Sequence, residues 1–353
     1  MKTLEYKSLL PRNGKLLSSI ILFVAISLMG LVSCAQSSDC VRKDVFCAGL
    51  VTNTSGIQDH GLNQNAWEGL QQAKEEGTAN QIAYIESVDS RDYVKNIMAF
   101  ADDNFDVIIT VGPAMDDETL QAADLYADSV FMGIDQSQRE TRPNLLPVTF
   151  PEDQMGFWAG ALAAHLTKTG VVGAICETSG IDSMWQYCEG FRQGATNADE
   201  NVKALILFRD NGSSERIFID SDWGHEAGRD LISRGADVIF AAGGGTGQGA
   251  LIAAAEAGIY AIGAEQDQAQ VLSEAAPALV TSIYGRADLE VLKWMRLIRD
   301  GHSIEGEVVA AFGHVPYQEV KIPIPDSLQS EMDQLLIDLS TGSLQTAVSL
   351  RAP

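Results

Sequence analysis

The chain has few basic residues for its size. Its 353 residues include 24 lysines and arginines against 48 aspartates and glutamates, so the formal net charge is −24 at pH 7. A surface this acidic repels the phosphates of nucleic acids and the anionic head groups of lipids. We therefore expect no nucleic-acid partner, and we expect contact with a membrane only through a covalent anchor.

The chain also lacks the short motifs of common hydrolases. Neither G-x-S-x-G nor H-E-x-x-H occurs, and there are only five histidines. No C-x-x-C and no close pair of histidines accompanies the cysteines, so nothing predicts a metal site. These absences favour a protein with no catalytic residues, no cofactor and no bound metal.

Long apolar runs are absent except at the N-terminus. Residues 16–32 are apolar apart from three serines and one glycine, and they follow a segment with four cations and one anion. A basic segment before a short apolar run predicts a secretory signal. The alternative is a single membrane anchor, for which this run is slightly short.

The apolar run ends in Leu31, Val32 and Ser33, directly before Cys34. This ending resembles a bacterial lipobox, in which the signal is cut before the cysteine and the sulfur receives a diacylglycerol. We therefore expect residues 1–33 to be a lipoprotein signal peptide and residues 34–44 a short tether. Loss of four cations and one anion would lower the net charge by three, to about −27.

Four cysteines remain if Cys34 carries the lipid. Four cysteines allow three pairings, and an extracytoplasmic compartment permits disulfides. Proximity in the sequence suggests that Cys40 pairs with Cys47 and that Cys176 pairs with Cys188. The alternative for Cys176, which lies in an apolar run, is a buried free thiol.

From residue 45 onward, apolar runs alternate with amphipathic segments. The predicted strands are 45–51, 81–86, 105–111, 129–134, 170–176, 202–208, 237–242 and 258–263, and the predicted helices are 63–76, 92–102, 117–127, 155–167, 184–198, 224–234 and 249–257. Continuous apolar strands separated by helices are typical of parallel sheets covered on both faces. Since about 320 mature residues exceed what one core usually serves, we expect two doubly wound α/β lobes with a ligand cleft between them.

The division between the two lobes is expected at the apolar stretch near residue 148. We assign 45–148 and about 264–285 to the first lobe, and 149–263 and about 286–353 to the second. Ligands of open α/β sheets bind beyond the carboxyl ends of the strands, so the loops at those ends are the candidate site.

The loop after the first predicted strand is polar and contains glycine. It runs from Asn53 to Gln64 and opens into a helix, which would turn its amides and side chains toward the cleft. The alternative interpretation is ordinary helix capping by Asp59 or Asn63.

The segment Gly56–Gly69 resembles a motif of the basic membrane lipoprotein family, the nucleoside-binding subunits of ABC importers. The family pattern is roughly G-x-x-D-K-S-F-N-Q-x-x-W-x-G. Asp59 and Asn63 match it, whereas His60 and Leu62 stand where the family has Lys and Phe. Further segments match in order along most of the mature chain: 92–97, 105–112, 150–160, 168–170, 189–191, 235–240, 243–247 and 260–268.

The resemblance implies a type I periplasmic-binding-protein fold that closes by a hinge over a ligand. In the family the ligand is a purine nucleoside, stacked between aromatic rings and held by acidic and amide side chains. The ligand-binding residues expected here are Asp59, His60, Leu62, Asn63, Gly112, Phe218, Asp220, Trp223, Gly244, Glu265 and Asp267. Phe218 or Trp223 could supply a ring face for a planar ligand, although either could instead belong to the core.

Besides His60, this sequence departs from the family at Leu62, Glu265 and Gly285. Leu62 removes one aromatic ring, and Glu265 stands where the family has an aspartate. Gly285 stands where the family has a lysine. Because the ligand contacts these positions in the family, the resemblance predicts the fold more firmly than the ligand.

The sequence therefore predicts a lipid-anchored solute-binding protein on the extracytoplasmic face of the cell membrane. Its expected partners are a small-molecule ligand, for which a purine nucleoside is the first candidate, and an ABC permease in the membrane. A ligand sensor is one alternative. A secreted enzyme is the other, either a nucleosidase or an NAD-type enzyme, because 245–250 fits G-x-G-x-x-A and Glu265 lies 20 residues after its start.

Overall fold

The strands of the described chain form two β-sheets, each with six strands. The computed structural model describes residues 39–138, 140–304, 306–318 and 324–353, and residues 40–353 form one unit. The predicted signal peptide, the lipobox and Cys34 lie outside the described residues. Among the described helices, none combines the length and the apolar character that crossing a membrane requires.

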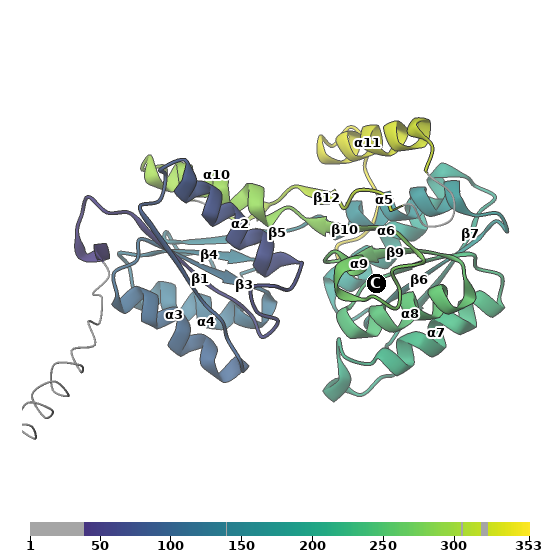
Figure 1. Ribbon diagram of the computed structural model, residues 1–353, viewed down its shortest axis with the longest axis horizontal. Coiled ribbons are helices and arrows are strands. Elements are labelled where there is room, and N and C mark those ends of the chain that lie inside the picture. Colours follow the sequence, from purple (N-terminus) through teal and green to yellow (C-terminus); the bar gives the residue numbers. More distant parts are fainter. Residues whose placement is uncertain (1–38, 139, 305, 319–323) are drawn as a thin grey trace, which may run out of the picture. The chain divides into compact units, whose positions relative to one another are not determined.

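The first sheet has the strand order β11-β5-β4-β3-β1-β2, and all of its strand pairs are parallel. Its strands are β1 (Cys47–Val51), β2 (Gln81–Ile85), β3 (Val107–Val111), β4 (Val130–Ile134), β5 (Leu145–Thr149) and β11 (Val308–Val309). One face carries α2 (Leu62–Glu75) and α10 (Ala287–Arg299), and the other carries α3 (Tyr93–Asp102) and α4 (Asp116–Leu125) (Figure 1). Strands β1 and β3 are buried along their whole length, as a sheet covered on both faces requires.

The second sheet has the order β12-β10-β9-β8-β6-β7, and only β12 runs antiparallel to its neighbour. Its strands are β6 (Val171–Cys176), β7 (Lys203–Phe208), β8 (Val238–Ala241), β9 (Tyr260–Ala264), β10 (Leu279–Gly285) and β12 (Phe312–His314). Its helices are α5 (Glu152–Leu166), α6 (Asp182–Ala198), α7 (Ser221–Ser233), α8 (Gly244–Ala257), α9 (Gln268–Val271) and α11 (Asp326–Ser340). Helices α5 and α6 cover one face, and α7 and α8 cover the other (Figure 1).

The predicted fold class is confirmed, because both sheets are doubly wound. The first five strands of each half follow one topology, β2-β1-β3-β4-β5 in the first sheet and β7-β6-β8-β9-β10 in the second. In such sheets the crevice for a ligand lies beyond the carboxyl ends of the strands, where the strand order reverses. Each predicted strand and helix is present, with ends shifted by a few residues.

The structure corrects the expected assignment of residues 264–353 to the two lobes. Strand β10 pairs with β9 in the second sheet, so 279–285 does not belong to the first lobe. Helix α10 instead packs on α2, where a Cβ on Gly69 would lie 2.5 Å from the carbonyl oxygen of Asp288. Only a glycine permits such an approach. Together with β11, this helix puts 287–299 and 308–309 in the first lobe.

The chain therefore passes between the two sheets three times. These passages lie between β5 and α5, between β10 and α10, and between β11 and β12. Alternation of strands and helices could not predict the second and third passages, because it shows the type of each element and not the sheet that the element joins.

Helices α5 and α6 pack with their backbones in direct contact. A Cβ on Gly156 would lie 2.1 Å from the carbonyl oxygen of Tyr187, and one on Gly190 would lie 2.2 Å from that of Asp153. No side chain fits in either place, so glycine is required on each helix. This contact fixes the first turn of α5, which begins at Glu152, beside the turn that carries Tyr187.

Both predicted disulfides are present. Cys40 is bonded to Cys47 at the start of β1, and Cys176 at the end of β6 is bonded to Cys188 in α6. The alternative of a free thiol at Cys176 is therefore wrong. The second disulfide ties α6 to the carboxyl end of the second sheet, which is the end where a ligand site is expected.

Candidate functional site

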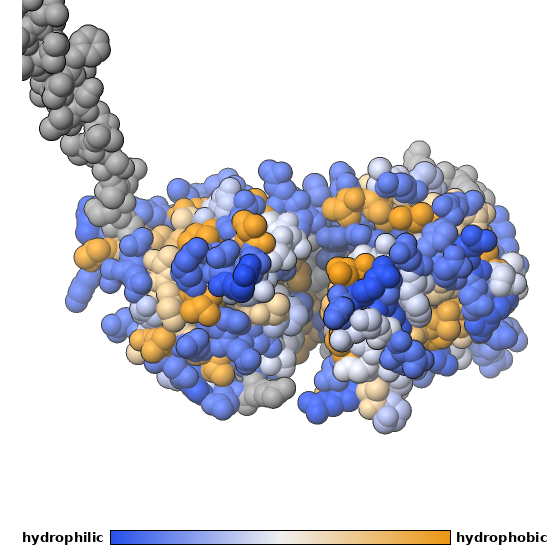
Figure 2. All heavy atoms as spheres, turned by 90° about the horizontal axis from the view of Figure 1, so that it is seen from below, coloured by the Kyte–Doolittle hydropathy of each residue, from blue (hydrophilic) through white to orange (hydrophobic). Residues whose placement is uncertain are grey.

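A cavity of about 500 Å³ is lined by residues that follow strands of both sheets. Figure 2 shows the molecular surface hollowed between the two lobes. The lining residues are Asn53, Thr54, Ser55, Asp59, Gly61, Leu62, Asp135, Phe150, Glu152, Met155, Ser183, Met184, Tyr187, Phe218, Ile219, Gly244, Gly245, Gln248, Glu265, Gln266 and Gly285. Five of the expected site residues are among them, namely Asp59, Leu62, Phe218, Gly244 and Glu265.

Strained backbone is concentrated around this cavity. Six non-glycine residues of the described chain have positive φ, and three of them line the cavity: Asp135 at 58°, Phe218 at 64° and Glu265 at 72°. Asp135 directly follows β4 and Glu265 directly follows β9, whereas Phe218 lies in the segment between β7 and α7. Because such a backbone costs about 1–3 kcal/mol at each residue, it persists where the surroundings enforce it, and it is common in ligand sites.

Asp59 shapes the loop in which it lies. Its Oδ1 accepts hydrogen bonds from the backbone N–H groups of Gly61 and Gln64, at 2.9 and 3.0 Å. Its Oδ2 accepts from the backbone N–H of Asn63 at 3.1 Å and from the side-chain amide of Asn63 at 2.7 Å. Four donors therefore already surround this carboxylate, so the capping interpretation of Asp59 describes its observed contacts.

Asn63 is fully buried behind the cavity and does not line it. Its side-chain nitrogen donates to Oδ1 of Asn53 at 3.0 Å, and its side-chain oxygen accepts from the backbone N–H of Asn53 at 3.2 Å. Asn63 thus links the start of α2 to Asn53, which does line the cavity. Gly112 lies behind the same residue, because a Cβ there would be 3.1 Å from Nδ2 of Asn53.

Glu265 follows β9 and points its carboxylate at the start of α8. Its two oxygens accept the backbone N–H groups of Gly243, at 3.1 Å, and Gly244, at 3.0 Å. Burial raises the pKa of Glu265 in spite of these two hydrogen bonds. The first amides of α8, which would face a phosphate in a dinucleotide site, are thus bonded to a carboxylate.

Two further acids of the cavity were not expected from the sequence. Burial, followed by repulsion from Glu265 and Asp116, raises the pKa of Asp135 to about 7. Burial, followed by repulsion from Asp135, raises the pKa of Glu152 well above its usual range. The carboxyl ends of the strands could have revealed Asp135, since it follows β4 directly. Glu152 begins a helix, and its place depends on how the two lobes meet.

Tyr187 shares this environment. It is 4 % exposed, lines the cavity, and places its hydroxyl 3.7 Å from Sδ of Met155. Burial, followed by the negative charges of Glu152 and Glu265, raises the pKa of the Tyr187 hydroxyl well above its usual range. No sequence pattern singled out Tyr187, because this residue occupies an ordinary core position of an amphipathic helix.

Gly285 ends β10 and lines the cavity. A Cβ at this position would lie 2.3 Å from Cδ1 of Phe150, so the phenylalanine ring occupies the space next to the glycine. The family resemblance predicts a lysine here. In this protein an aromatic ring lies against the position instead, and position 285 supplies no positive charge to the cavity.

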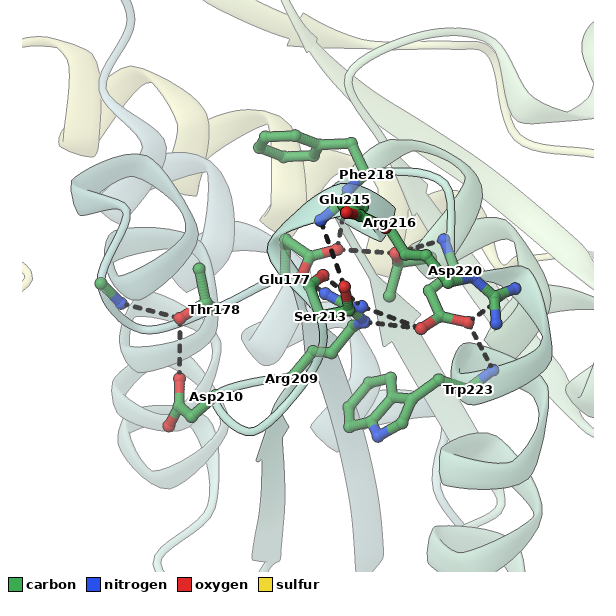
Figure 3. A network of polar contacts seen from close by, with 12 residues as sticks. Glu177, Thr178, Arg209, Asp210, Ser213, Glu215, Arg216, Phe218, Asp220 and Trp223 are labelled. Carbon is green, nitrogen blue, oxygen red and sulfur yellow. Dashed lines mark hydrogen bonds and ion pairs between the residues drawn. The ribbon is translucent and has the colours of Figure 1, made fainter.

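The loop that carries Phe218 is held by a buried network of charges (Figure 3). Glu177, which is fully buried, accepts the backbone N–H of Phe218 at 2.9 Å and the hydroxyl of Thr246 at 2.6 Å. Nη1 of Arg209 donates to the other oxygen of Glu177 at 3.0 Å. The ring of Phe218 points away from this network, and its residue lines the cavity (Figure 3).

Asp220 and Trp223 belong to the same network and not to the cavity lining. Asp220 Oδ2 accepts from Nε of Arg209 at 2.9 Å, and Oδ1 lies 3.0 Å from Nη2 of Arg216. Oδ1 also accepts the backbone N–H of Trp223 at 3.4 Å, which caps α7. The contacts of Asp220 and of the Trp223 backbone therefore stabilise the loop that carries Phe218.

His60 and Asp267 line a separate depression of about 340 Å³. The backbone N–H of Asp267 donates to the carbonyl oxygen of His60 at 2.9 Å, which joins the two lobes. The side chain of Asp267 caps α9 by accepting the N–H of Ala269 at 3.1 Å. The structure thus divides the expected site residues among a cavity, a neighbouring depression and the supports behind the cavity.

Comparison with known proteins places this geometry in a family. The sequence profile of the family described as ABC transporter substrate-binding protein PnrA-like matches residues 47–350. A protein named ABC transporter nucleoside-binding protein BmpA, from Lactococcus lactis, is 26 % identical over 266 residues, which are 69 % of this chain and 74 % of that protein. The CD4+ T-cell-stimulating antigen of Listeria monocytogenes is 28 % identical over 261 residues, which are 67 % of this chain and 69 % of that protein.

Solved structures agree on the fold. An ABC transporter solute-binding protein from Conexibacter woesei superposes with a TM-score of 0.69 at 21 % identity, and the match covers 85 % of this chain and 98 % of that one. One from Aeropyrum pernix gives a TM-score of 0.65 at 17 % identity, covering 85 % and 92 %. The fold is therefore the type I periplasmic-binding-protein fold that the resemblance implied. With two doubly wound lobes, and with its profile matched from the first strand to the C-terminal segment, this chain belongs to the PnrA-like family of extracytoplasmic ABC transporter substrate-binding proteins.

Proposed function

We propose that this protein is the lipid-anchored solute-binding subunit of an ABC importer, and that it captures a purine nucleoside or a similar small planar solute in the cavity. The observation that carries the proposal is the cavity itself, which lies at the carboxyl ends of both sheets. Its volume of about 500 Å³ suits a small solute. Rings of Phe150, Tyr187 and Phe218 supply apolar faces for a planar ligand.

The ligand acts by bridging the two lobes. Asp135 and the Asn53 loop follow strands of the first sheet, whereas Phe218 and Glu265 follow strands of the second. A ligand that contacts both sets gains most of its binding free energy when the lobes close around it, so it shifts the population toward the closed form. That form would then dock on the permease.

A binding role without catalysis fits the contacts at the two positions that suggested an enzyme. The amides of Gly243 and Gly244 are bonded to Glu265, so the glycine-rich turn offers them to a carboxylate and not to a pyrophosphate. His60, the histidine of the predicted cleft loop, lines the separate depression. The contacts at these two positions therefore support neither the NAD-type enzyme nor the nucleosidase.

A thermal-shift screen followed by calorimetry tests the ligand class. Adenosine, inosine and guanosine would be compared with free bases, sugars and amino acids. A ligand at about 100 times its dissociation constant stabilises the folded state by about 2.7 kcal/mol, which a thermal shift detects. A shift with nucleosides supports the proposal, a shift with sugars or amino acids alone contradicts its nucleoside part, and hydrolysis of a bound nucleoside contradicts the binding-only role.

The anchor and the transport role need tests in cells. Replacement of Cys34 by Ala should release the protein from the membrane fraction, because the diacylglycerol attaches to that sulfur. Deletion of the gene should abolish uptake of the radiolabelled ligand if the protein feeds a permease. Retained uptake, with a lost transcriptional response to the ligand, would favour the sensor alternative.

A further inference from the structure

The cavity contains acids without matching cations. Four of its lining residues are acids, Asp59, Asp135, Glu152 and Glu265, and no lysine, arginine or histidine is among its described lining residues. Asp59 is surrounded by four N–H donors, and Glu265 receives two. These donors solvate the charges but do not neutralise them.

Glu152 and Asp135 receive fewer hydrogen bonds than Asp59 and Glu265. Glu152 is 9 % exposed and lines the cavity, yet within the described residues its carboxylate accepts a hydrogen bond only from its own backbone N–H and forms no ion pair. A buried carboxylate without partners is costly, because burial removes the water that would solvate it. Asp135 likewise has no ion pair with any described residue, and both acids repel each other.

We propose that the cavity selects a positively charged solute, a planar molecule whose cationic group is held between Asp135, Glu152 and Glu265. This inference rests on the proposed function, and it narrows the ligand class of the same site. A cation placed among these acids supplies the positive charge that none of the described lining residues provides. A neutral solute would leave the acids uncompensated, and an anionic one, such as a nucleotide, would be repelled.

An organic cation fits the site better than a metal ion. Within the described residues, no group of three or more histidines, cysteines, aspartates or glutamates is arranged to hold a metal. The same cavity also presents the rings of Phe150, Tyr187 and Phe218. Aromatic faces attract organic cations by cation–π contacts, which adds to the attraction of the carboxylates.

The test compares solutes that differ in charge and little else. Calorimetry at pH 7.5 on the purified full chain would use two pairs: adenosine with 5′-amino-5′-deoxyadenosine, and nicotinamide with 1-methylnicotinamide. In each pair the second compound carries the positive charge. We expect each cation to bind at least about tenfold more tightly than its neutral partner, a difference of about 1.4 kcal/mol.

Substitutions in the cavity and outside it show which acid is responsible for the preference for the cationic solute. Glu152→Gln removes one carboxyl group from the cavity and keeps the shape of the side chain, so it should reduce the preference for the cation several-fold. Glu256→Gln is the matched control, because it removes one charge from an exposed position on α8 that does not line the cavity. It should leave the preference unchanged. Glu265→Gln serves as a second cavity variant if Glu152→Gln folds poorly.

The outcomes separate this inference from the proposed function. Equal or weaker binding of both cations, with adenosine bound, overturns the charge preference and leaves the proposed function standing. Binding of 1-methylnicotinamide without either adenosine compound supports the charge preference and contradicts the nucleoside class. Binding of none of the four compounds contradicts both. A cation preference that survives both cavity variants places the cationic group elsewhere and overturns the proposal.

Discussion

Two groups of acids lie near each other in this protein, and they differ in what neutralises them. Glu177 and Asp220 share the guanidinium of Arg209, and Asp220 has Arg216 as well. Asp135 and Glu152, in the cavity, have no arginine or lysine partner among the described residues. Glu152 and Asp220 are similarly buried, at 9 % and 7 % exposure, so the difference between these two acids lies in the pairing and not in the burial.

The paired acids have a structural task that the contacts reveal. Glu177 holds the backbone of Phe218, and Asp220 caps α7, so each carboxylate is committed to the fold (Figure 3). Within the described residues, the carboxylates of Asp135 and Glu152 form no hydrogen bond or ion pair with another part of the chain. Acids that are left without partners around a cavity are better explained by what enters the cavity than by what supports it.

Removal of Arg209 should have the largest effect. Arg209→Ala leaves the buried Glu177 without a cation and Asp220 with Arg216 alone, and we expect it to lower the free energy of unfolding by about 3–5 kcal/mol in urea denaturation. Arg216→Ala is the control, since half of its side chain is exposed. It should lower that free energy by less than about 1 kcal/mol. Equal effects of the two variants would show that the buried network is not what stabilises this loop.

Asp59→Ala should have the next largest effect. It leaves four N–H donors without their acceptor. We expect a loss of about 1–3 kcal/mol in the free energy of unfolding, because buried donors lose their partners. Differential scanning calorimetry without ligand measures this loss. An unchanged Tm, combined with weaker ligand binding, would instead mean that Asp59 contacts the ligand and matters little for the loop.

Glu152→Gln should behave in the opposite way to Glu177→Gln. Neutralising Glu152 relieves repulsion in the cavity, so the Tm of the ligand-free protein should stay the same or rise. Neutralising Glu177 removes the partner of Arg209 and should lower the Tm by several degrees, since 1 kcal/mol corresponds to about 2–4 °C in a protein of moderate size. A lower Tm for Glu152→Gln would show that Glu152 also supports the fold.

The pH dependence of stability gives the last test of the comparison. Asp135 has a pKa of about 7 in the folded protein, raised by burial and by Glu265 and Asp116, against about 3.9 in an unfolded chain. The folded state therefore binds more protons between these values, so the contribution of Asp135 to stability falls as the pH rises from about 4 to about 7 and is then constant. Asp135→Asn should gain stability relative to the parent protein between pH 5 and pH 8. A constant difference in Tm over that range would contradict the raised pKa.

The sequence predicted the elements of the fold because each strand is a continuous apolar run and each helix has one apolar face. It also predicted both disulfides from proximity. It missed the lobe to which β10 and α10 belong, because that choice depends on packing between residues far apart in the chain, such as Gly69 against Asp288.

Prediction of the site was limited for a related reason. Glu265 and Phe218 were found because their segments match motifs of the family, and Glu265 also directly follows a predicted strand. Glu152 and Tyr187 were not, since they begin or lie within helices and reach the cavity only through the packing of α5 on α6. The sequence motif identified Asp220, but it could not show that the carboxylate of Asp220 accepts a hydrogen bond from Arg209 instead of contacting a ligand.

The three passages of the chain between the sheets also constrain how the protein folds after export. The first lobe needs α10 and β11 to cover α2 and to complete its sheet, and these elements end at residue 309. The second lobe has only β12 and α11 still to come after that point. The lobe that begins first in the sequence therefore cannot be completed until most of the other has crossed the membrane. Until residues 287–309 have followed, the first lobe exposes the face of α2 that α10 covers in the folded protein.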